Sequence, residues 1–269
     1  MKILGILGLD YSGSTMVTNV LSGISNSASI GESHWILDKN LGCKECFNKP
    51  CPIFTKDMLA RLRRKELDDG EWWEIIAEYT KSDIIISSDK SPRIYERFGV
   101  PDYLLFLYKD PKANINSWCR RQFKDTINTS GYYSEDQINK GIAWWKKNTI
   151  SIFDWLNDNI SKNIAVLNLE DFCVNPYEGL AEISGWLGAE YDHTTVQFWT
   201  KDLHYIGGNH SVKRLSNEKF FYKSIKIDDR WKDKISPQCQ SVIDEDEEIK
   251  EIINKIIQIS NKTESHSYR

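Results

Sequence analysis

Four apolar runs with the character of buried β-strands are each followed along the chain by a segment with helical periodicity. The runs are Lys2 to Leu9, Asp83 to Ser88, Asp102 to Tyr108 and Asn163 to Leu169. Parallel strands need a crossover between them, and that crossover is usually a helix. The alternation therefore predicts an α/β fold with a parallel central sheet and flanking helices.

Apolar spacing and end signals place the helices. The predicted helices begin near Ser14, span Ser134 to Asp158, run from an N-cap at Asn175 to a stop at Gly188, and close the chain at about Asp246 to Ile259. Pro176 after Asn175 and the glycine at 188 are typical of a helix start and a helix end. A single domain spanning 1–269 is the expectation, because 269 residues are fewer than two domains of roughly 150. Residues 25–80, with three cysteines, are interpreted as a helical insertion that caps a site.

Composition excludes several classes of function. A net charge of −4 lacks the positive field that non-specific duplex binding requires, so we expect no nucleic-acid partner. The first apolar run is far shorter than the roughly 20 residues of a membrane helix, and no cleavage site follows it. We therefore expect a cytoplasmic protein without a membrane partner. Six cysteines are too few for a disulfide scaffold and predict reduced thiols.

The loop after the first predicted strand has the spacing of a phosphate-binding loop. Gly8 and Gly13 stand five residues apart, and Ser14-Thr15 then opens a helix. Such a loop presents backbone N–H groups and a helix N-terminus to one anion. The simpler interpretation is an ordinary glycine turn. Ser14 fills the place of the lysine of nucleoside triphosphatases, which argues against hydrolysis of ATP or GTP.

A second candidate phosphate site follows the strand that ends at Tyr108. Lys109 stands at the carboxyl end of that strand, where ligands bind in open α/β sheets, and Ser117 follows eight residues later on the next helix. Lys-Asp-Pro is also a common loop composition, so the pattern alone is weak.

These motifs, taken together, resemble those of the sulfotransferases that use 3′-phosphoadenosine 5′-phosphosulfate (PAPS). Ser12-Gly13-Ser14-Thr15 is similar to the core of the family's 5′-phosphosulfate loop, and Lys109 to Ser117 to its 3′-phosphate motif, with Lys in place of Arg. Three further segments are similar, in the family's order, over about residues 2 to 240. They are Asp89 to Arg93, Leu169 to Phe172 with Asn175-Pro176, and Gly207-Gly208-Asn209 with Lys213, Arg214 and Arg230 to Lys232.

The resemblance implies a P-loop-like sulfotransferase domain that transfers a sulfuryl group to an acceptor and releases 3′,5′-adenosine bisphosphate (PAP). It assigns one set of residues to the donor: Tyr11, Ser12, Gly13, Ser14, Thr15, Lys109, Ser117, Asn209, Lys213 and Arg214. Lys90 is the candidate cation at the transferring group.

Two positions depart from the family's pattern. Tyr11 stands where the family normally has a basic residue that contacts the transferring group, and Leu169 where many eukaryotic members have an adenine-stacking tyrosine. Lys90, Lys2 or Arg93 are the candidates to supply the missing charge. Without the resemblance, Lys90 is better explained as a solvated lysine that follows a strand.

Three residues are candidates for the general base that takes the acceptor's proton. Glu32 comes first, because many bacterial and carbohydrate-acting relatives are similar in carrying a catalytic Glu after the first helix. His34 comes second, because imidazole commonly serves as a general base, and His204 third. A surface carboxylate and structural histidines are the simpler interpretations.

Cys43, Cys46 and Cys51 have the spacing of thiolate metal ligands but provide only three ligands, whereas structural zinc takes four. His34 is a candidate for the fourth. Because sulfuryl transfer needs no metal, a disulfide or buried thiols are the preferred interpretation, and we expect no metal.

The expected function is transfer of a sulfuryl group to a hydroxyl, with an amine as second choice, of a small metabolite such as a secondary metabolite. Three aromatic pairs are candidates for an acceptor pocket, although core packing explains them better: Trp72-Trp73, Trp144-Trp145 and Tyr132-Tyr133. The alternatives are a kinase-like nucleotide-binding enzyme and an inactive nucleotide-binding scaffold of the same fold, the latter suggested by Tyr11.

Overall fold

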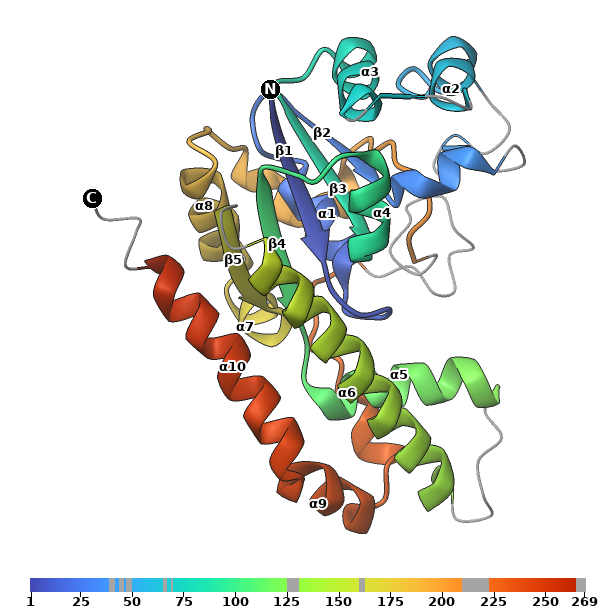
Figure 1. The fold of residues 1–269 in the computed structure, drawn as a ribbon, viewed down its shortest axis with the longest axis vertical. Coiled ribbons are helices and arrows are strands. Elements are labelled where there is room, and N and C mark those ends of the chain that lie inside the picture. The colour runs from blue at the N-terminus through green and yellow to red at the C-terminus, as the bar shows by residue number, and fades with distance from the viewer. Residues whose placement is uncertain are drawn as a thin grey trace. The chain divides into compact units, whose positions relative to one another are not determined.

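The computed structural model describes residues 1–38, 42–43, 46, 50–64, 67–68, 70–124, 131–159, 163–209 and 223–264. Five strands form one sheet in the order β2-β3-β1-β4-β5 (Figure 1). The strands are β1 Lys2–Leu7, β2 Ser27–Gly31, β3 Ile84–Lys90, β4 Tyr103–Tyr108 and β5 Asn163–Asn168. The predicted α/β fold with a parallel central sheet and flanking helices is confirmed.

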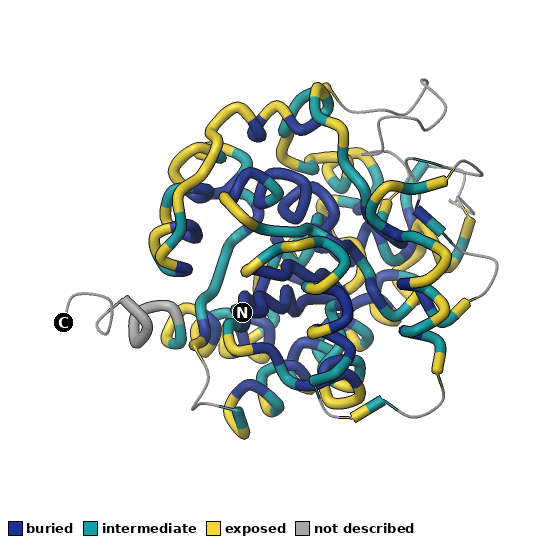
Figure 2. The backbone as a smooth tube through the Cα atoms, turned by 90° about the horizontal axis from the view of Figure 1, so that it is seen from above, coloured by how far each residue is buried: buried dark blue, intermediate teal, exposed yellow. Residues whose placement is uncertain are grey.

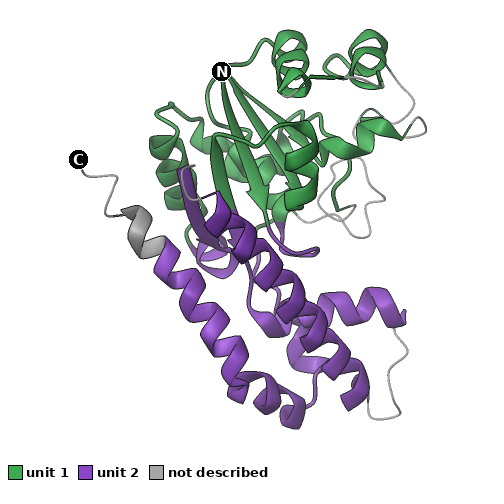
Figure 3. Ribbon diagram, viewed as in Figure 1, with its two compact units in different colours: residues 1–7, 14–105, 175–225 green, residues 8–13, 106–174, 226–269 purple. Residues whose placement is uncertain are grey.

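The chain divides into two compact units (Figure 3). The first unit comprises residues Met1–Leu7, Ser14–Leu105 and Asn175–Ile225, and the second comprises Gly8–Gly13, Phe106–Val174 and Lys226–Arg269. Among the residues that the structure describes, no helix is both long and apolar enough to cross a lipid bilayer.

The first unit is built on the parallel strands β2, β3 and β1. Its helices are α1 Ser14–Leu21, α2 Lys56–Leu62, α3 Glu71–Thr80, α4 Pro92–Phe98 and α8 Pro176–Trp186, with the 3₁₀ helices η1 Ser33–Leu37 and η2 His193–Thr200. Helices α1 and α8 pack together, α3 and α4 pack together, and both α1 and α3 contact β3. Strand β3 is buried along almost its whole length, as expected for a parallel strand with both faces covered. Figure 2 shows which parts of the backbone are buried and which are exposed.

The aromatic residues at 72 and 73 belong to the core of this unit. Trp72 and Trp73 are both 1% exposed, and Trp72 stacks on Phe98 at 4.0 Å between ring centroids. The indole N–H of Trp73 donates to the carbonyl of Gly99. Core packing, the preferred interpretation of this pair, therefore agrees with the structure.

Helices dominate the second unit. They are α5 Pro111–Phe123, α6 Glu135–Asp158, α7 Leu169–Val174, α9 Pro237–Glu245 and α10 Glu247–Glu264, with the 3₁₀ helix η5 Arg230–Asp233. Helix α6 begins with a capping box, in which Ser134 Oγ accepts from the N–H of Gln137 while Gln137 Oε1 accepts from the N–H of Ser134. Helices α5 and α6 pack together, and α10 packs on β5 and α6. Trp118 stacks on Trp144, and Trp145 is buried.

Two parts of the sequence analysis differ from the structure. Strand β2 lies inside the segment predicted as a helical insertion. Its sequence, Ser-Ala-Ser-Ile-Gly, has little of the β-branched and aromatic character typical of strands, and tertiary pairing with β3 decides it. The C-terminal helix begins at Glu247 as predicted but is preceded by α9, which the sequence analysis did not predict.

Candidate functional site

A buried carboxylate organises the polar residues at the carboxyl end of β3. Asp89 is 2% exposed and accepts hydrogen bonds from four donors. Its Oδ2 accepts from Ser33 Oγ at 2.6 Å and from Ser87 Oγ, and its Oδ1 accepts from the backbone N–H of His34 at 2.9 Å and from His34 Nδ1 at 2.6 Å. Because a carboxylate accepts, Nδ1 of His34 donates in this contact, and in a neutral ring Nε2 is then the acceptor nitrogen.

Glu32 and Lys90 form an ion pair in the first unit. Lys90 Nζ lies 2.9 Å from Glu32 Oε1, and both side chains are largely buried. The indole N–H of Trp35 donates to the other oxygen, Oε2, at 2.8 Å. Lys90 has a backbone φ of +67°, a left-handed conformation that costs a non-glycine residue of order 1–3 kcal/mol and that clusters at functional sites. Two of the three predicted catalytic residues are therefore in direct contact.

The segment from Tyr205 to Asn209 runs alongside Glu32 and also reaches the first turn of α1. The N–H of Glu32 donates to the carbonyl of Ile206 at 2.8 Å. The N–H of Asn209 donates to Thr15 Oγ1 at 3.0 Å. Gly207 and Gly208 make this approach possible, because a Cβ at either position would lie within 3 Å of Glu32 or Thr15. Asn209 and Thr15, which are both predicted to bind the sulfuryl donor, are thus brought together.

Replacing Gly207 with Ala is expected to destabilise the protein by about 1–3 kcal/mol, because the residue has a φ of +70° and its Cβ would lie 2.6 Å from that of Glu32. The free energy of unfolding, measured in denaturant, checks this. Gly185→Ala is the matched control, since Gly185 lies in α8, where an added Cβ would meet no atom within 4 Å, and it should stabilise by roughly 0.5–1 kcal/mol. Equal effects of the two variants would contradict the crowding at Gly207.

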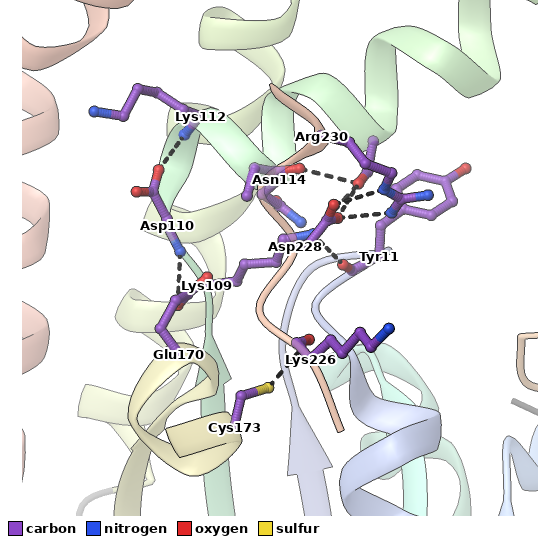
Figure 4. Close-up of polar contacts among 12 residues, drawn as sticks. Tyr11, Lys109, Asp110, Lys112, Asn114, Glu170, Cys173, Lys226, Asp228 and Arg230 are labelled. Atoms are coloured by element: carbon purple, nitrogen blue, oxygen red, sulfur yellow. Dashed lines mark hydrogen bonds and ion pairs between the residues drawn. The ribbon is translucent and has the colours of Figure 1, made fainter. Parts of the chain in front are cut away.

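In the second unit, Lys109 is the centre of a buried charged cluster (Figure 4). Its side chain is 3% exposed, and its Nζ lies 2.8 Å from Asp228 Oδ2 and 3.3 Å from Ser117 Oγ. Ser117 Oγ also lies 3.4 Å from the same carboxylate oxygen. The predicted Lys109–Ser117 pair therefore converges on one oxyanion, and that oxyanion is the carboxylate of Asp228.

Arg230 completes this cluster with a two-pronged contact to Asp228. Its Nε and Nη2 lie 2.6 and 2.8 Å from the two carboxylate oxygens. Burial alone would raise the pKa of Asp228, but the hydrogen bonds from Arg230 and the charge of Lys109 outweigh it and hold that pKa well below its usual range. Burial also lowers the pKa of Lys109, and the charge of Asp228 opposes that shift.

Side chains following β4 hold the loop from Gly8 to Gly13, which belongs to the same unit. Lys109 Nζ donates to the carbonyl of Tyr11 at 3.3 Å, and Asn114 Nδ2 donates to that of Asp10 at 3.0 Å (Figure 4). Tyr11 has a φ of +67°, and a Cβ on Gly13 would lie 2.7 Å from a methyl carbon of Leu169. The loop is therefore tightly constrained and left-handed at Tyr11, and its glycine at 13 is required.

A small cavity lies beside this loop, lined in part by Ser12, Lys109, Asn114, Trp145 and Thr149. Three of its lining residues each have a buried oxygen with no hydrogen-bond partner among the described residues: Ser12 Oγ, Asn114 Oδ1 and Thr149 Oγ1. Buried polar atoms in proteins are nearly always satisfied. A cavity with three unsatisfied oxygens and a lysine therefore suits a water molecule or a polar ligand group.

The remaining predicted residues lie in several different places. Ser14 and Thr15 are buried and open α1 in the first unit, whereas Tyr11, Ser12 and Gly13 belong to the second. Lys213 and Arg214 lie outside the described residues.

Lys2 cannot supply the charge missing at Tyr11, because it pairs in register with Ile84, at the opposite end of β3 from Lys90, and donates to the carbonyl of Leu187. The side chain of Arg93 is exposed.

The structure corrects two roles considered in the sequence analysis, that of His34 as a metal ligand and that of His204 as a general base. The proposal of His34 as fourth ligand beside the three cysteines is wrong, because its ring binds Asp89. His204 instead lies against Cys43, Cys46 and Cys51, and its Nδ1 faces their sulfurs rather than Glu32 or Lys90. The spacing of the cysteines indicated a cluster but could not identify a partner more than 150 residues away.

Sequence reasoning also missed Asp89, Trp35, Asp228 and Arg230 as partners in these clusters. For Asp89 a signal existed, because it follows a buried apolar run at the carboxyl end of a parallel strand, where ligands bind. For Asp228 there was none, since it lies 119 residues from Lys109 on a segment without strand or helix character.

Comparison with solved structures identifies the fold. A sulfotransferase domain from the curacin biosynthetic pathway matches with a TM-score of 0.61 and 17% identity, over 91% of this chain and 96% of that domain. A sulfotransferase from Alicyclobacillus acidocaldarius matches with a TM-score of 0.51 and 12% identity, over 97% of this chain and 96% of its own. The chain has the sulfotransferase fold.

A mouse sulfotransferase complexed with PAP also matches, with a TM-score of 0.48 and 12% identity, over 98% of this chain and 86% of the mouse chain. No protein-family model and no curated protein sequence matches the chain. At identities of 12 to 17% the similarity establishes the sulfotransferase fold alone. The function has to be argued from the residues.

Proposed function

We propose that this protein is a sulfotransferase that moves a sulfuryl group from PAPS to a hydroxyl, with an amine as second choice, of a small metabolite. The observation that carries the proposal is the oxyanion cluster of the second unit, in which Lys109 and Ser117 hold the carboxylate of Asp228. Lys109 and Ser117 are the two ends of the segment that resembles the 3′-phosphate motif of sulfotransferases. The matching curacin domain comes from a biosynthetic pathway, which favours a secondary metabolite as acceptor.

The residues fit an anionic nucleotide. Lys109 and Ser117 already bind an oxyanion, and Arg230 adds a third contact to the same carboxylate. We assign the 3′-phosphate of the donor to Lys109 and Ser117, in place of Asp228. Ser12, whose buried hydroxyl has no partner among the described residues, belongs to the loop that we assign to the 5′-phosphosulfate together with Tyr11, Gly13, Ser14 and Thr15. Asn209, Lys213 and Arg214 remain proposed donor contacts.

PAPS supplies the sulfuryl group, and the protein's task is to align the acceptor and to stabilise the charge that grows on the bridging oxygen. Lys90 is the proposed cation for that charge, because Tyr11 provides none and Lys2 lies at the other end of β3. Glu32 is the proposed base for the acceptor's proton. Its contact with Lys90 keeps the two groups together, and the N–H of Trp35 orients the carboxylate.

His34 is the second candidate for the base. Asp89 holds its Nδ1 at 2.6 Å and thereby leaves Nε2 to accept a proton, which is the arrangement of a general-base histidine. Asp89 is then a positioning residue. Glu32 contacts Lys90 and Trp35, whereas His34 contacts Asp89. Single substitutions of Glu32 and His34 therefore test the two candidate bases independently.

Thermal denaturation in the presence of nucleotides tests the donor assignment. PAP is expected to raise the melting temperature by several degrees, because a ligand at 100 times its Kd stabilises the folded state by about 2.7 kcal/mol. ATP with magnesium and 5′-AMP, which lack a 3′-phosphate, are expected to give little change. Lys109→Met measured in parallel should abolish the shift with PAP.

Three results would contradict the proposal. A shift with ATP and magnesium that exceeds the shift with PAP would favour the kinase-like alternative. No shift with PAP would remove the donor assignment. A shift with PAP but no transfer to any hydroxyl or amine acceptor would favour the inactive scaffold.

A further inference from the structure

Four potential metal ligands converge in the first unit. His204 Nδ1 lies 3.7 Å from Cys43 Sγ, 3.3 Å from Cys46 Sγ and 3.5 Å from Cys51 Sγ. All four ligand atoms lie within 4.8 Å of one another. The cysteines come from one short segment, and the histidine comes from a segment more than 150 residues later, so the fold itself assembles the cluster.

Hydrogen bonding does not explain this arrangement. The Nδ1 atom of a neutral imidazole has either one lone pair or one proton, so it can serve one thiol and not three. Disulfide bonding does not explain it either, because the three cysteines are free and an odd number cannot pair completely. One position in the centre of the four atoms satisfies all of them at once, which is the arrangement of ligands around a metal ion.

The distances agree with tetrahedral coordination. Zinc binds thiolate at about 2.3 Å and imidazole nitrogen at about 2.0–2.1 Å, so tetrahedral angles place sulfur and nitrogen about 3.6 Å apart. The three observed separations, 3.3, 3.5 and 3.7 Å, lie on both sides of that value. Three sulfurs and one nitrogen are a soft, closed ligand set that selects zinc over magnesium or calcium and leaves no position for substrate.

One backbone group contacts this cluster directly. The N–H of Phe54 donates to Cys51 Sγ at 3.3 Å and thereby orients that sulfur. On the other side of the imidazole, His204 Nε2 lies 4.0 Å from Asp202 Oδ2, which is too far for a hydrogen bond.

We propose that Cys43, Cys46, Cys51 and His204 bind one structural zinc ion. The ion would join the cysteine segment to the residue that precedes Tyr205–Asn209. That segment contacts Glu32 through Ile206 and Gly207, and it contacts Thr15 through Asn209. Zinc therefore supports the position of two proposed functional residues without taking part in transfer, and it revises our expectation that the chain binds no metal.

The experiment is a metal analysis of the full chain, produced without a histidine tag or chelators. We expect about one zinc ion per chain by inductively coupled plasma mass spectrometry. Cys46→Ser and His204→Asn should each lose most of it. Cys239→Ser, in α9, and His193→Asn, at the exposed start of η2, are matched controls that should retain it. Zinc content in the wild type no higher than in Cys46→Ser, or another metal in its place, would overturn the proposal.

A second measurement uses only the wild type, in case the variants fold poorly. Cobalt exchanged into the protein is expected to show the intense visible bands of tetrahedral cobalt and a thiolate-to-cobalt charge-transfer band in the near ultraviolet. Removal of zinc should make Cys43, Cys46 and Cys51 reactive toward a thiol reagent and lower the melting temperature by several degrees, because metal binding contributes to folding. Absence of the charge-transfer band, or a disulfide among the three cysteines, would overturn the proposal. None of these readouts depends on the donor or on transfer activity.

Discussion

Replacing Lys109 with Met is expected to lower the free energy of unfolding by about 3 kcal/mol. Lys109 is 4% exposed, and its loss leaves the buried carboxylate of Asp228 with Arg230 and Ser117 as its remaining partners. Breaking a buried ion pair by removing one member costs about 3–5 kcal/mol, because an incompletely compensated charge stays behind. Denaturant unfolding followed by circular dichroism measures this value. The same variant should lose stabilisation by PAP.

A double-mutant cycle distinguishes the energy of the Lys109–Asp228 ion pair from the energy lost through a general packing defect. Lys109→Met combined with Asp228→Asn should be more stable than Lys109→Met alone, because the orphaned charge is gone. Lys140→Met is the control, since Lys140 forms an exposed ion pair with Asp136 on α6 and should cost less than about 1 kcal/mol. If Lys109→Met and Lys140→Met destabilised the protein equally, the buried cluster would not be the strong interaction that its geometry indicates.

Replacing Glu32 with Gln is expected to lower kcat for sulfuryl transfer by about 10²- to 10⁴-fold, the range contributed by a general base. Gln keeps the size of the side chain and its contact with the N–H of Trp35 but cannot take a proton. Steady-state kinetics with PAPS and a reactive hydroxyl acceptor measures the effect. Stabilisation by PAP should stay close to that of the wild type, because the proposed 3′-phosphate contacts are unchanged.

His34→Gln provides the comparison. If Glu32 is the base, this variant should lose less than about tenfold in kcat, because the loss of the imidazole changes the position of neighbouring groups but removes no proton acceptor. The reverse result, full transfer by Glu32→Gln and a large loss in His34→Gln, would assign the base to His34 with Asp89 as its orienting partner. Lys90→Met should lose about 10²- to 10³-fold in either case, because it removes the proposed charge stabilisation.

The elements that could be predicted from sequence are those with strong local signals. Strands β1, β3, β4 and β5 are apolar runs whose positions follow from hydropathy, and β1, β3 and β4 are buried along most of their length. Helix α6 has a regular apolar spacing and a capping box at Ser134, so both its extent and its start are visible in the sequence. Strand β2 could not be found in this way, because its Ser-Ala-Ser-Ile-Gly sequence becomes a strand only beside β3.

The same distinction applies to the candidate site. Strand ends and spacing indicated the loop from Gly8 to Thr15 and the Lys109–Ser117 pair, whereas Glu32 and Lys90 became catalytic candidates through the resemblance to sulfotransferases. The loop and Lys109 directly follow predicted strands, so local folding places them at the carboxyl ends of those strands. Their residue types then indicate the chemistry of an oxyanion site.

Only the tertiary structure decided which partners these residues have. Asp228 with Lys109, Asp89 with His34, and His204 with the three cysteines are pairs separated by 55 to more than 150 residues. No periodicity or propensity connects such distant positions, because contacts of this kind form when whole elements pack and not when local segments fold. The sequence by itself therefore determined four of the five strands, the loop from Gly8 to Thr15 and the candidate cations. Packing of distant segments determined which carboxylates, thiols and imidazoles complete the sites.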